Sequence, residues 1–440
     1  MSRFRLLKGF VALAAVSLIA AACAGDGGGG PAPDGADPCE QDEFGCVEVA
    51  AGEPIQVGTL LVITGENASL GQDSQNGTVL AADFLGQDPW PGETAGEILG
   101  HPVEFNHQDD GCSPEGGQAG ATALAAEEGV VAVIGTSCSS AALGVADQIL
   151  SDEGIALISP SNTGPDLTDP TTHQPFYLRT AHNDLMQGAA VARFAFEEQG
   201  FQTAATIHDG SPYADGLQQA FADEFERLGG QITTQEAIQV GDTDFGPLLS
   251  DIAQDAPDLL YFPIFVAEGG LITQQARQTP GLEDTALAGS DGMFTPDWIE
   301  AAGAENAEGA FISGPDLTAF ANPDFYENEF LPAYEEKFGE EPQSVFHAHS
   351  FDAFMMLVAA LEEAAIQNDD GSLTIPRTAL KDALFATEGF EGITGTLTCS
   401  DTGDCQQEAT MAVVTVENGE FTDPVYSIQL NLEELLGTSP

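Results

Sequence analysis

Basic residues are scarce in this sequence. It contains 10 lysines and arginines against 71 aspartates and glutamates, which gives a formal net charge of −61 at pH 7. Beyond the first 22 residues only seven basic residues remain, and two of them, Lys337 and Lys381, are lysines. Such a surface repels nucleic acid and anionic lipid, and it has no basic stripe with which to bind either. We therefore expect no nucleic-acid partner and a surface suited to a salty or ion-rich medium.

Motifs for common kinds of catalysis are also missing. There is no Gly-x-Ser-x-Gly elbow and no glycine-rich phosphate loop followed by lysine. The Asp-Thr-Gly of aspartic proteases occurs once, not twice, and we expect Asp401 and Asp404 to lie in a solvated loop. His347 and His349 would face about 200° apart on a helix, so we expect one buried and one exposed side chain rather than a metal site. No Cys and His spacing typical of zinc occurs. We expect no enzyme activity, no metal and no cofactor.

Apolar runs long enough to span a membrane are absent after the N-terminus. Phe10–Ala22 is apolar but short, and it follows Arg3, Arg5 and Lys8, as in an export signal. The run stops at three alanines and Cys23, which resembles a bacterial lipoprotein signal; an ordinary secretory peptide is the alternative. We expect a signal peptide at 1–22, a lipidated tether at 23–52 and an extracytoplasmic protein that meets the bacterial membrane only through lipid on Cys23.

Cysteines are few, and their number fits an exported chain. Of seven cysteines, six remain when Cys23 is set aside for lipid. Six cysteines allow 15 pairings, so spacing alone decides nothing. Three plausible pairs in an oxidising compartment are Cys39/Cys46, Cys112/Cys138 and Cys399/Cys405.

Strand-like and helix-like segments alternate along the chain, which predicts an α/β protein with parallel sheets. The expected strands are Ile55–Ile63, Pro102–Asn106, Val130–Ile134, Ile155–Ile158, Thr203–His208, Leu259–Phe265 and Ala286–Ala288. The expected helices are Gly77–Leu85, Gly116–Glu128, Ser140–Ser151, Leu185–Glu198, Gly216–Leu228, Phe245–Gln254, Gly269–Gln278 and, later, Val345–Ala365. The alternation restarts after Phe176–Thr180, which indicates a second sheet. An Asn418-Gly419 turn after Ala412–Val416 predicts a β-hairpin near the C-terminus.

Two clusters of small polar residues follow two of the expected strands. Thr136–Ser140 follows Val130–Ile134, and Ser159–Thr163 follows Ile155–Ile158. Ligands of open α/β sheets bind at the carboxyl ends of strands, where free amides at a helix start attract anions. Hydroxyl oxygens can also accept a hydrogen bond from an ammonium group. Helix capping explains each residue singly, but the two clusters together favour a site for a zwitterion.

Several motifs, taken together and in order, resemble the leucine/isoleucine/valine-binding proteins of branched-chain amino acid ABC transporters. They are DDGCSP (109–114), SCSS (137–140), DEGIALISPSNTGPDLT (152–168), FYLRTAHND (176–184), IHDGSPYADGL (207–217) and GSDGM (289–293). The resemblance implies the type 1 periplasmic-binding clamshell: two Rossmann-like lobes with parallel sheets, joined by a hinge of three crossings. It places an N-terminal lobe at 53–180 and 315–396 and a C-terminal lobe at 181–314 and 397–432.

The resemblance also implies ligand-binding residues. Ser139 and Thr163 would bind the ligand carboxylate, and the backbone at Ser161 and the carboxylate of Asp291 would bind the ammonium. Asn162, in the same loop as Ser161, is also expected to bind the ligand. Further candidates are Tyr213, which would cover the ligand, and Leu70 and Phe265, which would face its side chain. Cys112 and Cys138 match a family disulfide beside this loop.

The implied function is capture of a small amino acid and its delivery to an ABC transporter permease by a monomeric protein. Two departures from the family keep the ligand open: Leu70 stands where an aromatic residue is frequent, and Asp291 replaces the usual glutamate. An amide, urea or a small carboxylic acid is an alternative ligand. A sensor of the same fold that signals to a membrane partner is the alternative function. Asp297 is expected to be solvated.

Overall fold

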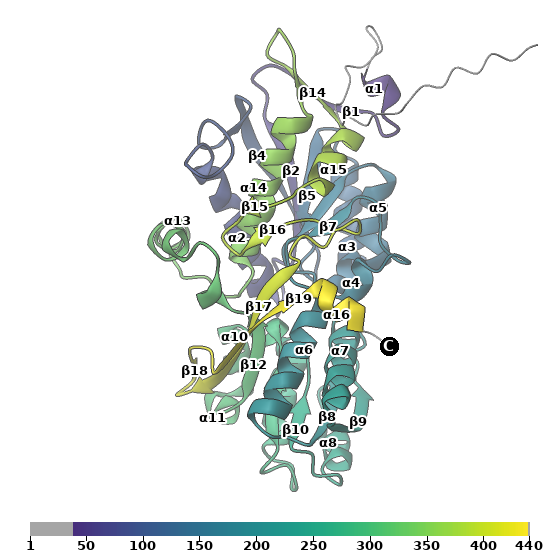
Figure 1. Cartoon of the computed structure of the whole chain (residues 1–440), viewed down its shortest axis with the longest axis vertical. Helices are drawn as coiled ribbons and strands as arrows, with labels where there is room; N and C mark the ends of the chain where they lie inside the picture. Colours follow the sequence, from purple (N-terminus) through teal and green to yellow (C-terminus); the bar gives the residue numbers. More distant parts are fainter. Residues whose placement is uncertain (1–37, 439–440) are drawn as a thin grey trace, which may run out of the picture. The chain divides into compact units, whose positions relative to one another are not determined.

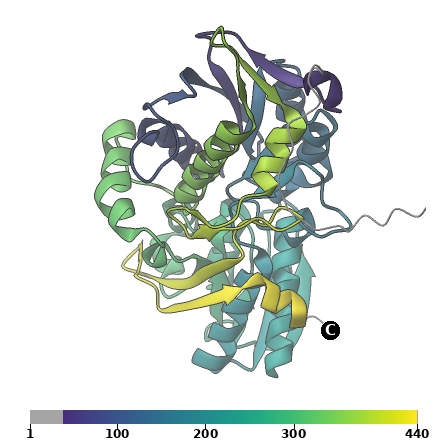
Figure 2. The ribbon, with the colours of Figure 1, turned by 45° about the horizontal axis from the view of Figure 1, so that its top comes forward.

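The computed structural model describes residues 38–438, which form two α/β lobes, each built on its own main sheet (Figure 1). Both lobes collect segments that are distant in the sequence. In both views the C-terminal strands, in yellow, lie with the teal elements of the second lobe, whereas the light-green helices α14 and α15 lie with the blue elements of the first (Figure 2). Among the described residues, no helix is both long and apolar enough to cross a bilayer.

The first lobe contains a six-stranded sheet in the order β3-β4-β2-β5-β6-β7, in which every pair except β3–β4 is parallel. Its strands are β2 (Ile55–Leu61), β3 (Glu97–Ile98), β4 (His101–Asp109), β5 (Val130–Gly135), β6 (Ala156–Ser159) and β7 (Tyr177–Arg179). Its helices are α2 (Ala68–Ala81), α3 (Pro114–Ala125), α4 (Ser139–Ala141), α5 (Asp147–Asp152), α12 (Pro323–Phe325), α13 (Leu331–Phe338), α14 (His347–Ala364) and α15 (Arg377–Phe385).

The second lobe contains an eight-stranded sheet in the order β18-β17-β12-β11-β10-β8-β9, with β19 also paired to β17. Its strands are β8 (Thr203–His208), β9 (Gln231–Ala237), β10 (Leu259–Tyr261), β11 (Ala286–Gly289), β12 (Phe311–Pro315), β17 (Glu408–Glu417), β18 (Glu420–Phe421) and β19 (Tyr426–Asn431). Its helices are α6 (Asp184–Arg193), α7 (Pro212–Leu228), α8 (Gly246–Ile252), α9 (Val266–Ala276), α10 (Pro296–Ala302), α11 (Ala304–Ala307) and α16 (Leu432–Thr438). Neighbouring strands in the part of the sheet ordered β12-β11-β10-β8-β9 are parallel. The predicted Asn418-Gly419 turn joins β17 to β18.

The segment 38–49 is part of the folded protein, not of the tether that we assigned to 23–52. After the short helix α1 (Pro38–Gln41), β1 (Cys46–Val49) pairs with β14 (Leu373–Pro376), which also pairs with β13 (Ile366–Gln367). Val47 and Val49 are buried. This strand was not predicted, because its alternation of polar and apolar residues covers only four positions and lies beside a cysteine-rich, acidic segment. The signal segment and Cys23 lie outside the described residues.

The chain passes between the lobes three times: after β7, after β12, and between β16 (Thr396–Leu397), which pairs with β15 (Phe390–Glu391), and β17. Backbone hydrogen bonds join the crossings laterally. Arg179 N donates to Gly403 O at 2.8 Å, and Asp316 N donates to Thr410 O at 2.9 Å.

Two expected helices differ from the observed ones because of glycines. Helix α2 begins at Ala68 rather than Gly77, and a Cβ on Gly71 would lie 1.9 Å from the Val62 carbonyl oxygen. These glycines lower helix propensity but allow close packing. The expected helix Ser140–Ser151 is interrupted at Gly144, whose φ is +66°.

Candidate functional site

The two polar clusters that the sequence predicts lie side by side at the carboxyl ends of β5 and β6. Their side chains tie the two loops together. Ser139 Oγ accepts a hydrogen bond from Gly164 N at 3.2 Å, and Ser161 Oγ donates to Ser137 O at 3.1 Å. Asn162 Nδ2 donates to Thr136 O at 2.9 Å. The loops therefore form one rigid floor on the first lobe.

Asn162 is fully buried, and its side-chain amide is already used within this floor. Its oxygen accepts from Thr136 Oγ1 at 3.1 Å. Thr163 differs, because its backbone N–H donates no hydrogen bond within residues 38–438. This makes Thr163 the better candidate for direct ligand contact, while Asn162 supports the loop.

A disulfide and a buried carboxylate fix the position of the Ser137–Ser139 segment. Cys112 is bonded to Cys138, and the structure also joins Cys39 to Cys46 and Cys399 to Cys405. Asp110 accepts backbone hydrogen bonds from Ser137 at 2.6 Å and Cys112 at 2.7 Å. Burial raises the pKa of Asp110 to about 7, although these hydrogen bonds oppose the rise.

The second lobe contributes an aromatic and acidic cluster. Tyr213, in the first turn of α7, has its hydroxyl 2.6 Å from Ser290 Oγ and donates to Asp291 Oδ1 at 2.9 Å. The ring of Phe265 lies 5.2 Å from the ring of Tyr213. Asp291 is only 5% exposed, and burial raises its pKa to about 6. A cation placed here would relieve the cost of a buried carboxylate.

Two residues of this cluster, His182 and Asp184, were not predicted from the sequence. Ligand atoms of His182, Asp184 and Asp291 all lie within 4.8 Å of one another, and all three residues are buried. Burial and the neighbouring charge of Asp291 raise the pKa of Asp184 well above its usual value. Neither oxygen of Asp184 has a donor in good hydrogen-bonding geometry among the described residues.

The hydrogen bonds of the neighbouring Gln187 determine which ring nitrogen of His182 carries the proton. The Gln187 amide nitrogen donates to Ser313 Oγ at 3.0 Å, so its oxygen must accept from His182 Nε2, 2.7 Å away. Burial lowers the pKa of His182 to about 4, so the ring is neutral at neutral pH and Nδ1 carries a free lone pair. Because this trio could also hold a divalent cation, a ligand screen should include a chelator.

The two lobes meet around these clusters. Asp184 N donates to Thr163 O at 2.9 Å, and Ser69 Oγ donates to Asp297 across the opening. A small pocket between them, with a cavity volume of about 10 Å³, is lined by Leu70 and Val266 together with polar residues that include Asp291 and Asp297. Asp297 is exposed, as expected, but its contact with Ser69 gives it a part in closing the cleft.

A family model described as "Periplasmic binding protein" matches residues 54–420. The chain belongs to this family.

Named relatives and solved structures agree with the assignment. A Leu/Ile/Val-binding protein homolog of Brucella melitensis is 28% identical over 81% of this chain and 89% of its own length. The Leucine-, isoleucine-, valine-, threonine-, and alanine-binding protein of Pseudomonas aeruginosa is 27% identical over 80% of this chain and 88% of its own. A leucine-binding protein, LivK, from Thermotoga maritima superposes with a TM-score of 0.73 at 26% identity, covering 86% of this chain and 99% of that one. LivJ of Streptococcus pneumoniae, solved with isoleucine, gives 0.71 at 25% identity, covering 86% and 100%.

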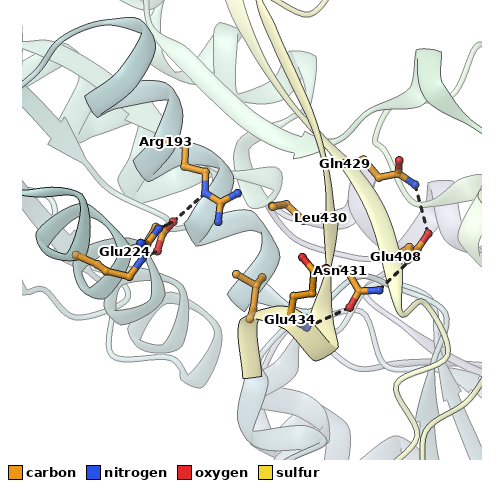
Figure 3. Close-up of a pocket in the computed structure, with 9 residues that line it drawn as sticks. Arg193, Glu224, Glu408, Gln429, Leu430, Asn431 and Glu434 are labelled. Atoms are coloured by element: carbon orange, nitrogen blue, oxygen red, sulfur yellow. Dashed lines mark hydrogen bonds and ion pairs between the residues drawn. The ribbon is translucent and has the colours of Figure 1, made fainter. Parts of the chain in front are cut away.

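Another hollow of this binding protein is less suited to a ligand, because its charged groups are paired. Figure 3 shows it on the second lobe, between α6, α7 and the C-terminal strands. Glu224 binds Arg193 at 2.8 Å and Arg227 at 2.5 Å, and Glu408 accepts from Asn431 at 3.1 Å.

Two expectations about isolated residues were wrong. His347 and His349 are both fully buried, because α14 packs between other elements on all sides; His347 Nδ1 lies 2.9 Å from Asp73. Asp404 is not solvated but 5% exposed, since it pairs with Arg179 at 2.6 Å. Asp401, in the same loop, is exposed.

Proposed function

We propose that this protein captures a small amino acid with an apolar side chain in the cleft between its lobes and delivers it to an ABC transporter permease. One observation carries the proposal. Among the described residues, the first-lobe side of the cleft offers hydrogen-bond donors but no unpaired basic side chain, and two buried carboxylates lie opposite these donors. A zwitterion matches this division, because its carboxylate needs donors and its ammonium needs acceptors.

The ligand carboxylate would bind at the first-lobe floor. The candidates are the hydroxyl of Ser139 and the hydroxyl and N–H of Thr163, whereas the backbone carbonyl of Ser161 is a candidate for the ligand ammonium. Arg179, the basic residue nearest this floor, already holds Asp404 and loop carbonyl oxygens, which favours binding by amides and hydroxyls.

The ligand ammonium would bind between Asp184 and Asp291. Tyr213 orients Asp291 and would cover the ligand together with Phe265. A bound ammonium would offset the charge of a carboxylate pair that burial otherwise disfavours.

The ligand side chain would face Leu70 and Phe265. Leu70 and Val266, which line the pocket between the lobes, would offer apolar contacts to this side chain. The names of the relatives, and the isoleucine bound to the Streptococcus pneumoniae protein, support the branched-chain class.

Thermal unfolding with single candidate ligands tests this function. The 20 amino acids, small amides, urea and short organic acids would be added one at a time in buffer with a chelator. Leucine, isoleucine or valine should raise the free energy of unfolding by about 2.7 kcal/mol at 100 times its Kd. Stabilisation by an amide, urea or acid alone would contradict the amino-acid proposal. Loss of uptake on gene deletion would then separate transport from sensing.

We also propose that Cys23 carries the lipid anchor and that the lobes comprise 53–180 with 315–396 and 181–314 with 397–432. The Ala-Ala-Ala-Cys sequence supports the anchor. Cys23→Ser should move the protein from the membrane fraction to the soluble extracytoplasmic fraction. A wild-type protein that is already fully soluble outside the cell would contradict it.

A further inference from the structure

Arg179 lies at the end of β7, where the chain leaves the first lobe, and it has no solvent exposure. Its guanidinium reaches back to the segment that contains the proposed ligand loop. Nη1 donates to Asn162 O at 3.1 Å and to Gly164 O at 2.8 Å, and Nη2 donates to Thr168 Oγ1 at 2.8 Å. One side chain therefore fixes both ends of the loop around Thr163.

The charge of this buried arginine is met by Asp404, which belongs to the third crossing between the lobes. Arg179 Nε lies 2.6 Å from Asp404 Oδ1. The backbones pair as well: Arg179 N donates to Gly403 O at 2.8 Å, and Cys405 N donates to Arg179 O at 3.1 Å. The Cys399–Cys405 disulfide closes the loop that presents Asp404.

The direction of the loop carbonyl groups links this contact to ligand binding. In a trans peptide the C=O and the following N–H point in opposite directions. Because Arg179 holds the carbonyl oxygen of Asn162, it turns the N–H of Thr163 away from itself. That N–H donates to nothing in the described part of the chain, so it is available to a ligand.

We propose that Arg179 and Asp404 are positioning residues that aim the Thr163 N–H at the ligand, and that the Cys399–Cys405 loop thereby sets ligand affinity without touching the ligand. The inference rests on the proposed function, since it takes this loop as the carboxylate site. Without Asp404 the guanidinium would remain buried with carbonyl partners but without its paired carboxylate, which is costly.

Asp404→Asn tests the proposal, with Glu224→Gln as the matched control. Both changes replace a carboxylate that binds arginine by an amide, but Glu224 lies on α7 and its arginines do not contact the loop. Calorimetry with L-leucine and L-isoleucine should show at least a tenfold rise in Kd for Asp404→Asn, or about 1.4 kcal/mol. Glu224→Gln should stay within about twofold of wild type, or 0.4 kcal/mol.

Hydrogen exchange gives a second readout that needs no ligand. Backbone amides of residues 160–168 should exchange faster in Asp404→Asn than in wild type or Glu224→Gln. Unchanged affinity together with unchanged exchange would overturn the proposal, and so would an equal loss of affinity in both variants. If wild type binds neither amino acid, the proposed function fails, and exchange alone decides the positioning role.

A second pair of variants covers the case in which Asp404→Asn does not fold. Serine replacement of Cys399 and Cys405 should weaken binding and speed exchange in 160–168. Serine replacement of Cys39 and Cys46, which join α1 to β1, should do neither. Equal behaviour of the two disulfide variants would overturn the proposal.

Discussion

Replacing Asp291 by asparagine should weaken ligand binding by at least tenfold while leaving the fold intact. The asparagine oxygen can still accept the hydrogen bond that Tyr213 donates at 2.9 Å, so the geometry of the cluster is kept. The change removes only the charge that the ligand ammonium would meet. Hydrogen bonds to charged groups contribute about 1.5–3 kcal/mol, which corresponds to a rise in Kd of roughly 10- to 150-fold.

Asp184 remains in this variant and can retain part of the attraction, so we expect the effect near the lower limit, about tenfold. Without ligand the variant should unfold at the same temperature as wild type or slightly above it. The reason is that Asp184 and Asp291 disfavour each other's charge, as the raised pKa of Asp184 indicates. Weaker binding without lost stability is thus the expected signature.

Calorimetry with the amino acid identified by screening, alongside thermal unfolding, measures both quantities. Asp284→Asn is a better control than Asp297→Asn, because Asp284 is exposed on the same lobe, whereas Asp297 accepts a hydrogen bond from Ser69 across the cleft. Equal affinities for Asp291→Asn and Asp284→Asn would refute the reasoning. The bound molecule would then carry no ammonium group, and the site would have to suit an amide or an acid.

Three other outcomes are expected. Amino-acid affinity should fall as the pH is lowered through about 6, where Asp291 takes up a proton in the empty site, and Asp291→Asn should show a weaker pH dependence in calorimetry; a flat wild-type profile would argue against a carboxylate-bound ammonium. Serine replacement of Cys112 and Cys138 should lower the free energy of unfolding by about 3 kcal/mol and weaken binding, and free thiols at both positions in mass mapping of wild type would exclude the bridge. Raising NaCl from about 0.1 M to about 1 M should raise Tm by screening repulsion among acidic groups, and a constant or falling Tm would contradict this.

The alternation of strands and helices predicted most strands of the first main sheet and about half of those of the second, because buried parallel strands read as continuous apolar runs. The central strand β12 and the C-terminal strand β19 were not predicted. Strand β9 was missed, since its sequence Gln-Ile-Thr-Thr-Gln-Glu-Ala is mostly polar and it lies at the edge of its sheet. The start of helix α2 was predicted too late in the sequence, because its glycines lower helix propensity and their role in close packing is visible only in the folded structure.

The candidate site was predicted unevenly. Ser139, Thr163, Tyr213 and Asp291 came from short motifs, and the structure brings these segments together. Asp184 could not be chosen from 71 acidic residues by type, because what distinguishes it is burial beside Asp291. The Arg-Thr-Ala-His-Asn-Asp run at 179–184, a single basic residue followed by polar ones after a buried strand, was the available signal. Asp404 was misjudged because its partner Arg179 is 225 positions away in the sequence.

The lateral hydrogen bonds among the crossings have a mechanical consequence. The third crossing pairs with the first through Arg179 and Gly403, and the second pairs with the start of β17 through Asp316 and Thr410. Three connected strands behave as a ribbon, which bends easily out of its plane but resists shear and twist, because those motions break the bonds between its edges. The two lobes are therefore left with essentially one soft degree of freedom, a rotation that opens and shuts the cleft. Each closure then returns the facing surfaces of the two lobes to the same arrangement.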